Sequence, residues 1–223
     1  MIILISAGHG GDELGAVGNG LIEKNMNLEV ALLLEEKLKQ YDCEVIMARR
    51  DDSEMSLNSR VLKQKITNSN VVVDIHHNAF DGKKSGYEIY HSIVGGEGKD
   101  LAYAIGKEFS KVQKKKYIGP RESDIYKGKD FYFIIKHTSC PAIITEFCYI
   151  DSPDYKNFDA DLEATLLCNG IVDFYKLERL EEEYDEFEEV EVPTLDEYLE
   201  FKEKTERRLK RIESLLDGKR NIR

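Results

Sequence analysis

Apolar and polar positions along the first 177 residues predict strands and helices in turn. Short apolar runs rich in Val and Ile predict strands, and longer stretches with apolar residues three or four positions apart predict helices. The expected strands are residues 2–6, 44–48, 71–75, 87–90 and 142–145, and the expected helices are residues 25–40, 56–67, 98–116 and 159–175. This alternation predicts an α/β fold, with a mostly parallel or mixed central sheet and helices on both faces.

The pattern changes in the last quarter of the chain. Glu dominates residues 181–192, a run that ends at Pro193 and predicts a solvated linker. Thr194 and Glu197 have the spacing of a capping box, so we expect a helix to begin there and to end near Leu216, at Asp217-Gly218. The chain therefore divides into a first domain of residues 1–177, an acidic linker of residues 178–193 and a C-terminal helical appendage of residues 194–223.

The apolar residues of the last helix fall on a and d positions of a heptad. They are Leu195, Tyr198, Leu209, Ile212 and Leu216, and Lys202 and Thr205 interrupt them. Acidic residues gather in 196–200 and basic residues in 207–211, so antiparallel pairing of two helices would bring opposite charges together. Two interpretations stay open: the helix self-associates or docks on a partner, or it packs on the first domain.

The charge balance of the chain excludes some partners. Asp and Glu total 43 against 32 Lys and Arg, so the formal net charge is −11. A chain this acidic repels phosphates, which argues against a nucleic-acid binder and against binding to an anionic membrane surface. No apolar run is long enough to span a bilayer, so we expect no membrane partner.

Two further features indicate synthesis in a reducing compartment. The cysteines, Cys43, Cys140, Cys148 and Cys168, form no C-x-x-C pair and lie in or beside apolar stretches, so we expect buried free thiols rather than disulfides. The apolar residues 1–6 are too short for a signal peptide and predict a strand. We therefore expect a protein that is made in the cytoplasm and reaches an outside substrate only after release.

Four positions in the first domain carry candidate chemistry. His9 stands among glycines just after the first expected strand, and Glu23 lies in the loop that leads from that strand to the first long helix. His76 and His77 follow the strand of residues 71–75, and Glu146 directly follows the strand of residues 142–145. Strand alternation places Asp74 and His76 on one face and His77 on the other. Polar groups at the end of a buried strand are costly unless they are paired or bind a metal, which favours a functional role.

The carboxyl ends of the strands bring these positions together. In open α/β sheets ligand sites form beyond those ends, and His9, His76 and Glu146 each fall at one. A ligand set of two His and one Glu leaves a fourth position for water, as hydrolytic zinc sites need, and a spare carboxylate could serve as general base. The candidates include no Cys, which favours Zn²⁺ over a structural thiolate site.

Several blocks of sequence occur in a characteristic order along residues 1–177. They are Ala7 to Gly11 with Gly15-Ala16, Gly20 to Lys24, Val45 to Arg49, Ser56 to Arg60, Asp74 to Ala79, Gly86 to Tyr90, and Pro141 to Phe147 with Asp151. Together these blocks resemble the zinc-dependent N-acetylmuramoyl-L-alanine amidases of the amidase 3 type. The resemblance implies that His9, Glu23 and His76 hold Zn²⁺ and that Glu146 activates water. It also implies the substrate, the amide between the lactyl group of N-acetylmuramic acid and L-alanine in peptidoglycan.

The chain departs from the family's usual sequence at a few positions. Glu13-Leu14 stands where the family usually has Asp-Pro, Asp74 replaces a usual Ser, and His77 replaces a small residue. The family register selects His76 as the ligand, and His77 could line the substrate groove. His91 and His137 match no ligand block, so we interpret them as structural or surface residues.

Two other classes of function stay open at this point. A zinc peptidase or carboxypeptidase acting on the stem peptides of peptidoglycan would share the metal site. A non-enzymatic module would use the C-terminal helix and keep the first domain as a relic, but a complete set of site residues argues against it. For an amidase, a phage endolysin released by a holin and a sporulation-type lysin freed by cell lysis both fit.

Overall fold

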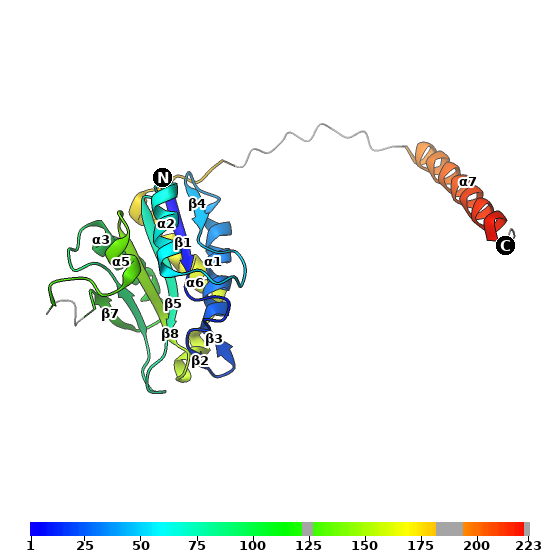
Figure 1. The fold of residues 1–223 in the computed structure, drawn as a ribbon. Coiled ribbons are helices and arrows are strands. Elements are labelled where there is room, and N and C mark those ends of the chain that lie inside the picture. Colours follow the sequence, from blue (N-terminus) through cyan, green and yellow to red (C-terminus); the bar gives the residue numbers. More distant parts are fainter. Residues whose placement is uncertain (122–126, 182–193, 221–223) are drawn as a thin grey trace. The chain divides into compact units, whose positions relative to one another are not determined.

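The computed structural model describes residues 1–121, 127–181 and 194–220, and in residues 206 and 209–220 it describes only the helical backbone. The chain forms two units, residues 1–180 and residues 181–223. In the first unit, strands form an inner layer between helices (Figure 1). No helix in the described part of the chain is both long and apolar enough to cross a bilayer.

A six-stranded mixed sheet forms the centre of the first unit. Its strands, in spatial order, are β4 (Glu44–Met47), β1 (Ile2–Ala7), β5 (Val71–Asn78), β8 (Ala142–Tyr149), β6 (Tyr87–Tyr90) and β7 (Lys115–Gly119). The first four are parallel, β6 is antiparallel to β8, and β7 is parallel to β6. The α/β fold with a mostly parallel or mixed sheet is therefore confirmed.

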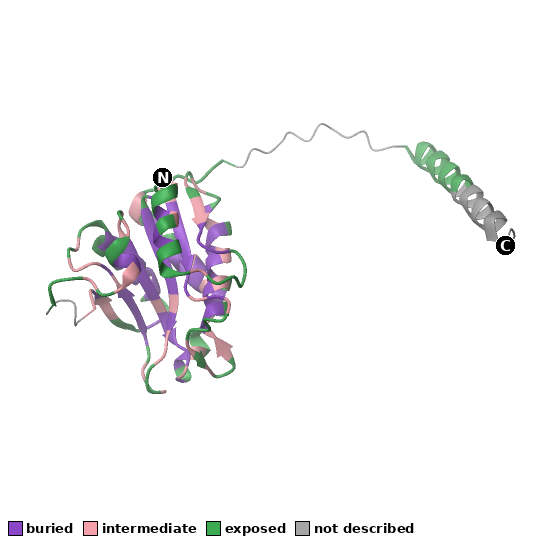
Figure 2. Ribbon diagram, viewed as in Figure 1, coloured by how far each residue is buried: buried purple, intermediate pink, exposed green. Residues whose placement is uncertain are grey.

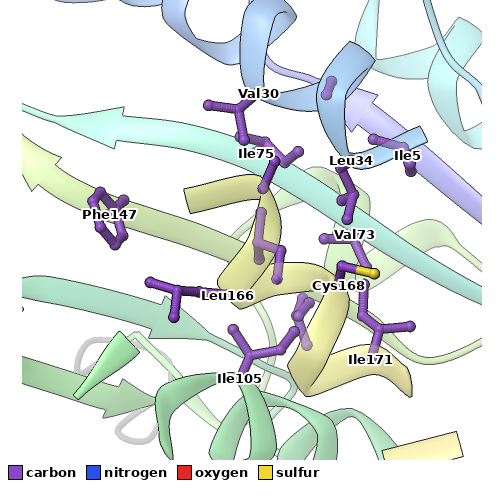
Figure 3. Close-up of a cluster of buried hydrophobic side chains, with 14 of the residues drawn as sticks. Ile5, Val30, Leu34, Val73, Ile75, Ile105, Phe147, Leu166, Cys168 and Ile171 are labelled. Atoms are coloured by element: carbon purple, nitrogen blue, oxygen red, sulfur yellow. The ribbon is translucent and has the colours of Figure 1, made fainter. Parts of the chain in front are cut away.

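Helices cover both faces of this sheet, as expected. The larger core packs α1 (Glu23–Leu38), α3 (Glu97–Phe109) and α6 (Ala160–Tyr175) on one face, which we call the inner face. Figure 3 shows this core, with Val30 and Leu34 of α1 close to Ile75 and Val73 of β5. A smaller core packs α2 (Leu57–Thr67) and α5 (Phe133–His137) on the other face, which we call the outer face. The strands β1, β5 and β8 are among the most deeply buried elements (Figure 2).

Local sequence explains where several elements begin. Ser56 caps α2 by accepting a hydrogen bond from the Ser59 N–H, and Asp159 caps α6 by accepting one from the Leu162 N–H. Such caps satisfy donors that a helix N-terminus leaves unpaired. Along β5, alternation sends Val73 and Ile75 into the inner core and leaves Asp74 and His76 for the outer face.

The structure corrects several expected elements. The helix expected over residues 98–116 ends at Phe109, because the lysine-rich segment after it forms the edge strand β7 beside β6. The hairpin of β2 (Val17–Gly18) and β3 (Leu21–Ile22) and the five-residue α5 were not predicted, since elements this short carry no readable period. All four cysteines are free, although Cys43 and Cys140 are only half-buried.

The first unit ends slightly later than expected. The Leu180 N–H donates to the Gln40 carbonyl at 2.8 Å, and the Glu178 N–H donates to Asp42 Oδ1 at 2.9 Å. Residues 178–180 therefore belong to the first unit rather than to the expected linker, of which residues 182–193 lie outside the described residues.

The second unit contains a single described helix, α7 (Leu195–Arg220). The expected capping box is present, because the Glu197 N–H donates to Thr194 Oγ1 and the Thr194 N–H donates to Glu197 Oε2. The helix continues past the stop expected at Asp217-Gly218. Leu195 and Tyr198 are exposed, whereas the side chains of the other expected heptad residues, Leu209, Ile212 and Leu216, lie outside the described residues.

Candidate metal centre

The loop after β1 holds His9 in an unusual backbone conformation. His9 has a φ of 59°, in the left-handed region that non-glycine residues rarely adopt. Two buried arginines fix this loop by its carbonyl oxygens: Arg49 donates to Ala7 and Gly8, and Arg60 donates to Ala7 and His9. The two arginines of the family-like blocks therefore stabilise the loop that presents His9.

Two glycines allow the ligand side chains to approach the backbone closely. A Cβ atom on Gly8 would lie 2.2 Å from Cε1 of the His76 ring. A Cβ atom on Gly15 would lie 2.5 Å from Glu23 Oε2 and 2.5 Å from His9 Cδ2. No larger residue fits at either position without moving the cluster.

Glu23 contributes a carboxylate whose two oxygens have separate partners. Glu23 is the first residue of α1, so its expected position in a loop is corrected. Its Oε2 accepts a hydrogen bond from the Ala16 N–H at 2.8 Å. Its Oε1 lies 3.2 Å from His9 Nε2 and 2.8 Å from His76 Nδ1. The backbone contact thus turns the other oxygen toward both histidines.

His9, Glu23 and His76 form one compact group. Their candidate ligand atoms all lie within 4.8 Å of one another, and the two imidazole rings meet edge to face with centroids 5.0 Å apart. Four ligands around Zn²⁺ at their usual bond lengths lie roughly 3.3 to 3.6 Å from one another. Two imidazole nitrogens and a carboxylate oxygen at these separations fit such an ion, while the assignment of each as a ligand stays a prediction.

A second carboxylate orients His76. Asp74 is buried on the same face of β5, and its Oδ2 lies 3.4 Å from His76 Nε2. Burial disfavours charge on the imidazole, but Asp74 and Glu23 outweigh it and raise the pKa of His76 well above its usual value. Burial likewise opposes charge on Glu23, yet hydrogen bonds from His76 and His9 lower the pKa of its carboxyl. A carboxylate that contacts the other ring nitrogen of a metal-binding histidine commonly fixes the orientation of the ring and its tautomer.

Glu146 lies beside this group on the neighbouring strand. It is the register partner of His76 across the β5–β8 ladder, and its Oε2 is buried with no hydrogen-bond partner among the described residues. Burial, reinforced by Glu23, Glu88 and Asp74 and opposed by His76, raises the pKa of Glu146 to about 8. A carboxyl with such a pKa can accept and release a proton near neutral pH.

His77 faces the opposite side of β5, as strand alternation predicted. Its ring is buried between α1 and α6, with Nδ1 2.8 Å from Asn27 Oδ1 and Nε2 3.0 Å from Glu163 Oε2. The suggestion that His77 lines a substrate groove is therefore wrong, because both nitrogens are engaged inside the protein. His91 is buried beside Ser92, and His137 is exposed on α5 and packs on Phe133, so neither joins the cluster.

A pocket of about 320 Å³ opens over the outer face at His76 and Glu146. Asp74 also lines it, and the apolar wall consists of Leu57, Phe131, Tyr132, Phe133, Ile134 and Ile144. Sequence reasoning missed this wall, because most of it comes from α5 and the loop before it. Burial and the nearby Glu146 raise the pKa of Tyr132 to about 12, so its hydroxyl stays protonated and can donate.

The chain is similar to known proteins over the unit that carries this cluster. The sequence pattern of the N-acetylmuramoyl-L-alanine amidase family matches residues 3–163. The uncharacterized protein YqiI of Bacillus subtilis (strain 168) is 31% identical over 180 residues, which are 78% of this chain and 84% of YqiI. The N-acetylmuramoyl-L-alanine amidase LytC of the same bacterium is 30% identical over 182 residues, and the match spans 78% of this chain but 35% of LytC.

A solved structure has the same fold. The catalytic domain of CwlV, an N-acetylmuramoyl-L-alanine amidase from Bacillus (Paenibacillus) polymyxa var. colistinus, superposes with a TM-score of 0.70 at 28% identity, over 79% of this chain and 99% of that domain. The fold is therefore that of an amidase catalytic domain. The chain belongs to the N-acetylmuramoyl-L-alanine amidase family.

Proposed function

We propose that this chain is a zinc-dependent amidase that hydrolyses the amide between the lactyl group of N-acetylmuramic acid and L-alanine in peptidoglycan. The observation that carries the proposal is the grouping of His9, Glu23 and His76 within 4.8 Å, with Glu146 as the register partner of His76. Family membership supports the same substrate class. His9, Glu23 and His76 are the ligands in this proposal, and Glu146 is the catalytic base.

Each residue of the site has a defined task in this reaction. Bound zinc supplies a Lewis acid for the scissile carbonyl and makes water more acidic. Glu146 accepts the proton of the attacking water and passes it to the leaving amine of alanine, a shuttle suited to its pKa of about 8. Asp74 holds the His76 ring through Nε2, and Arg49 and Arg60 hold the His9 loop.

Product masses test the proposed reaction directly. Purified peptidoglycan digested with the protein should yield glycan strands without peptides, together with intact stem peptides that begin with L-alanine. A chelator should abolish these products, and added Zn²⁺ should restore them. The matched control is Glu146→Gln, which keeps the size of the side chain and removes the base. Release of a terminal amino acid from otherwise intact muropeptides would instead identify a carboxypeptidase and contradict the proposal.

The substrate places the site of action in the cell wall. The setting that fits the proposal is a lytic enzyme that reaches the wall after release, by a holin or by lysis of the cell that made it. Protein added from outside to washed cell walls should clear the suspension. The same protein expressed inside intact bacteria should leave their walls uncut until the membrane is permeabilised, and earlier lysis would contradict this setting.

For residues 194–223 the proposal is self-association of α7 through a second copy of the chain. Two of the heptad residues, Leu195 and Tyr198, are exposed. The described part of the helix also carries charged residues of both signs, Glu200, Lys204 and Arg207. The segregated acidic and basic halves of the sequence favour antiparallel pairing. A tether that begins after Leu180 would leave the first unit free to act on an insoluble wall.

Truncation tests the role of α7. The structure sets the cut after Leu180, because residues 178–180 bond to the first unit. A full-length oligomer that becomes a stable, active monomer on truncation supports self-association. Equal molar masses, with a large loss of thermal stability in the truncated form, would show instead that the helix packs on the first unit.

A further inference from the structure

A second, smaller pocket lies on the outer face beside the proposed active site. It has a volume of about 290 Å³ and is lined by Glu88, Tyr90, Lys116, Tyr117 and Arg121. Across the sheet, Glu146 of β8 pairs with Glu88 of β6, and Glu88 pairs with Tyr117 of β7. Neighbouring strands are about 4.8 Å apart, so this pocket is roughly one to two strand spacings from the catalytic carboxylate.

Aromatic side chains connect the two pockets. The Arg121 guanidinium lies 3.9 Å from the centroid of the Phe131 ring and 5.8 Å from that of Tyr132, and both rings line the pocket over His76. Tyr90 of the second pocket packs on Tyr132 with centroids 5.0 Å apart. One continuous surface therefore leads from Glu146 to Arg121.

The charge of the second pocket differs from that of the chain. The chain as a whole carries a formal charge of −11, yet this pocket has Lys116 and Arg121 at its rim. Neither cation forms an ion pair with a carboxylate in the described parts of the chain, 1–121, 127–181 and 194–220. The guanidinium of Arg121 is held over an aromatic ring, which fixes its position and leaves its edge N–H groups able to donate.

The acidic residue of the pocket is already engaged inside the protein. Glu88 is 8% exposed, and its carboxylate accepts hydrogen bonds from Tyr149, Tyr90 and Asn78. Both of its oxygens therefore already have donors within the protein. Two cations at the rim against one internally bonded carboxylate leave a surface that attracts anions.

We propose that this pocket binds a carboxylate of the stem peptide, on the second or third residue after the bond that is cut, through Lys116 and Arg121. The inference rests on the proposed amidase function. In that substrate the lactyl carboxyl is part of the amide, so the glycan side brings no charge and the free carboxylates lie on the peptide. An extended peptide advances about 3.5 Å per residue, so two or three residues span the distance from Glu146 to the pocket.

Muramyl tripeptides of three kinds test this subsite: one with free carboxylates, one amidated at the second residue and one amidated at the third. The protein should cleave the free form about five- to tenfold better, in kcat/KM, than one of the two amidated forms, as expected for loss of a charged hydrogen bond near the surface. The double variant Lys116→Gln/Arg121→Gln should lose this discrimination through a higher KM for the free peptide.

Matched controls keep the test specific. Lys115→Gln removes the same charge from the same strand outside the pocket, and it should keep the full discrimination. Lys116 is exposed, so Lys116→Gln alone should fold normally and lose part of the discrimination. A wild-type protein that cleaves the three peptides equally, or a double variant that still discriminates, would overturn the proposal.

Failure of the subsite and failure of the proposed function give different results. Binding of the same three peptides to Glu146→Gln measures the pocket without catalysis, and the dissociation constants should rank as the kcat/KM values do. If product masses show that another bond is cut, the amidase proposal fails while these binding constants still report on the subsite. If the amide is cut and the constants do not differ, only the subsite fails.

Discussion

Two adjacent histidines on β5 show how differently the two faces of the sheet are used. The side chain of His76 is 20% exposed, lines the outer pocket and faces Glu23 and Asp74. The side chain of His77 is completely buried, and each of its ring nitrogens has one partner within 3.0 Å, Asn27 or Glu163. The outer histidine has room for a ligand beside it, and the inner histidine has none.

The comparison teaches that surroundings, rather than residue type, separate a reactive histidine from a structural one. Around His76 lie the carboxyl groups of Glu23, Asp74 and Glu146, the last two of which line the open pocket, and such a concentration of acidic groups suits a cation. Around His77 both ring nitrogens have partners inside an apolar core, where removal of one partner leaves the other buried and unpaired. Loss of His76 should therefore change function, and loss of His77 should change stability.

The largest effect should follow from His76→Ala. Two remaining ligands hold a metal poorly, so the variant should lose zinc on gel filtration and its turnover should fall by ~10³ or more. Elemental analysis of the eluted protein and release of stem peptides measure the two effects. His137→Ala is the matched control, because His137 is exposed on α5, and it should behave as the wild type. Full zinc content in His76→Ala would reject His76 as a ligand.

The next effect is on catalysis alone. Glu146→Gln keeps the shape of the side chain, should bind zinc and unfold as the wild type does, and should lower turnover by ~10² or more because the base is gone. Steady-state cleavage of a defined muropeptide measures turnover, and zinc content measured on the same sample shows whether the metal is retained. Turnover at the wild-type rate would remove Glu146 from the mechanism.

On the inner face, His77→Ala should act on stability. It leaves Glu163 buried without its imidazole partner and opens a cavity, which together should lower the free energy of unfolding by about 2–4 kcal/mol. Urea unfolding measures the loss, and a double-mutant cycle with Glu163→Gln shows how much of it comes from this pair. The zinc content should remain that of the wild type. Loss of zinc from His77→Ala, combined with zinc retained by His76→Ala, would mean that the roles of the two histidines are reversed.

Much of the fold could be predicted because each main element has a clear period. The apolar runs of β1, β5 and β8 and the stripes of α1 and α6 are long enough to be read locally. The direction of β6 and β7 could not be read, because strand pairing depends on contacts between distant segments. The lysines at residues 114–116 also give no apolar pattern, so the sequence does not separate the end of α3 from the start of β7 at Lys115.

The same reasoning explains which parts of the site could be predicted. The proposed ligands and Glu146 follow strands or sit in recognisable blocks, and the structure brings them together. The positions of Glu88, Tyr90 and the aromatic wall of α5 depend on the antiparallel register of β6 and on a five-residue helix. Asp74 appeared in the sequence as a departure from the family, and only the fold places its oxygen 3.4 Å from His76 Nε2.

The smallest effect in this series should come from Asp74→Asn. This substitution changes a residue that orients His76 and leaves all three proposed ligands in place. The contact at 3.4 Å is long for a hydrogen bond, so the carboxylate acts mainly by its charge and by fixing the ring. Loss of the charge should lower zinc affinity about tenfold. This is the low end of the loss in metal affinity that follows when a group supporting a metal-binding histidine is removed. Competition with a chromogenic chelator measures this affinity. Asp81→Asn, on an exposed loop, is the charge-matched control and should leave it unchanged. Equal affinities for the two variants would mean that Glu23 and the backbone alone orient His76, and that Asp74 serves only the packing of the outer face.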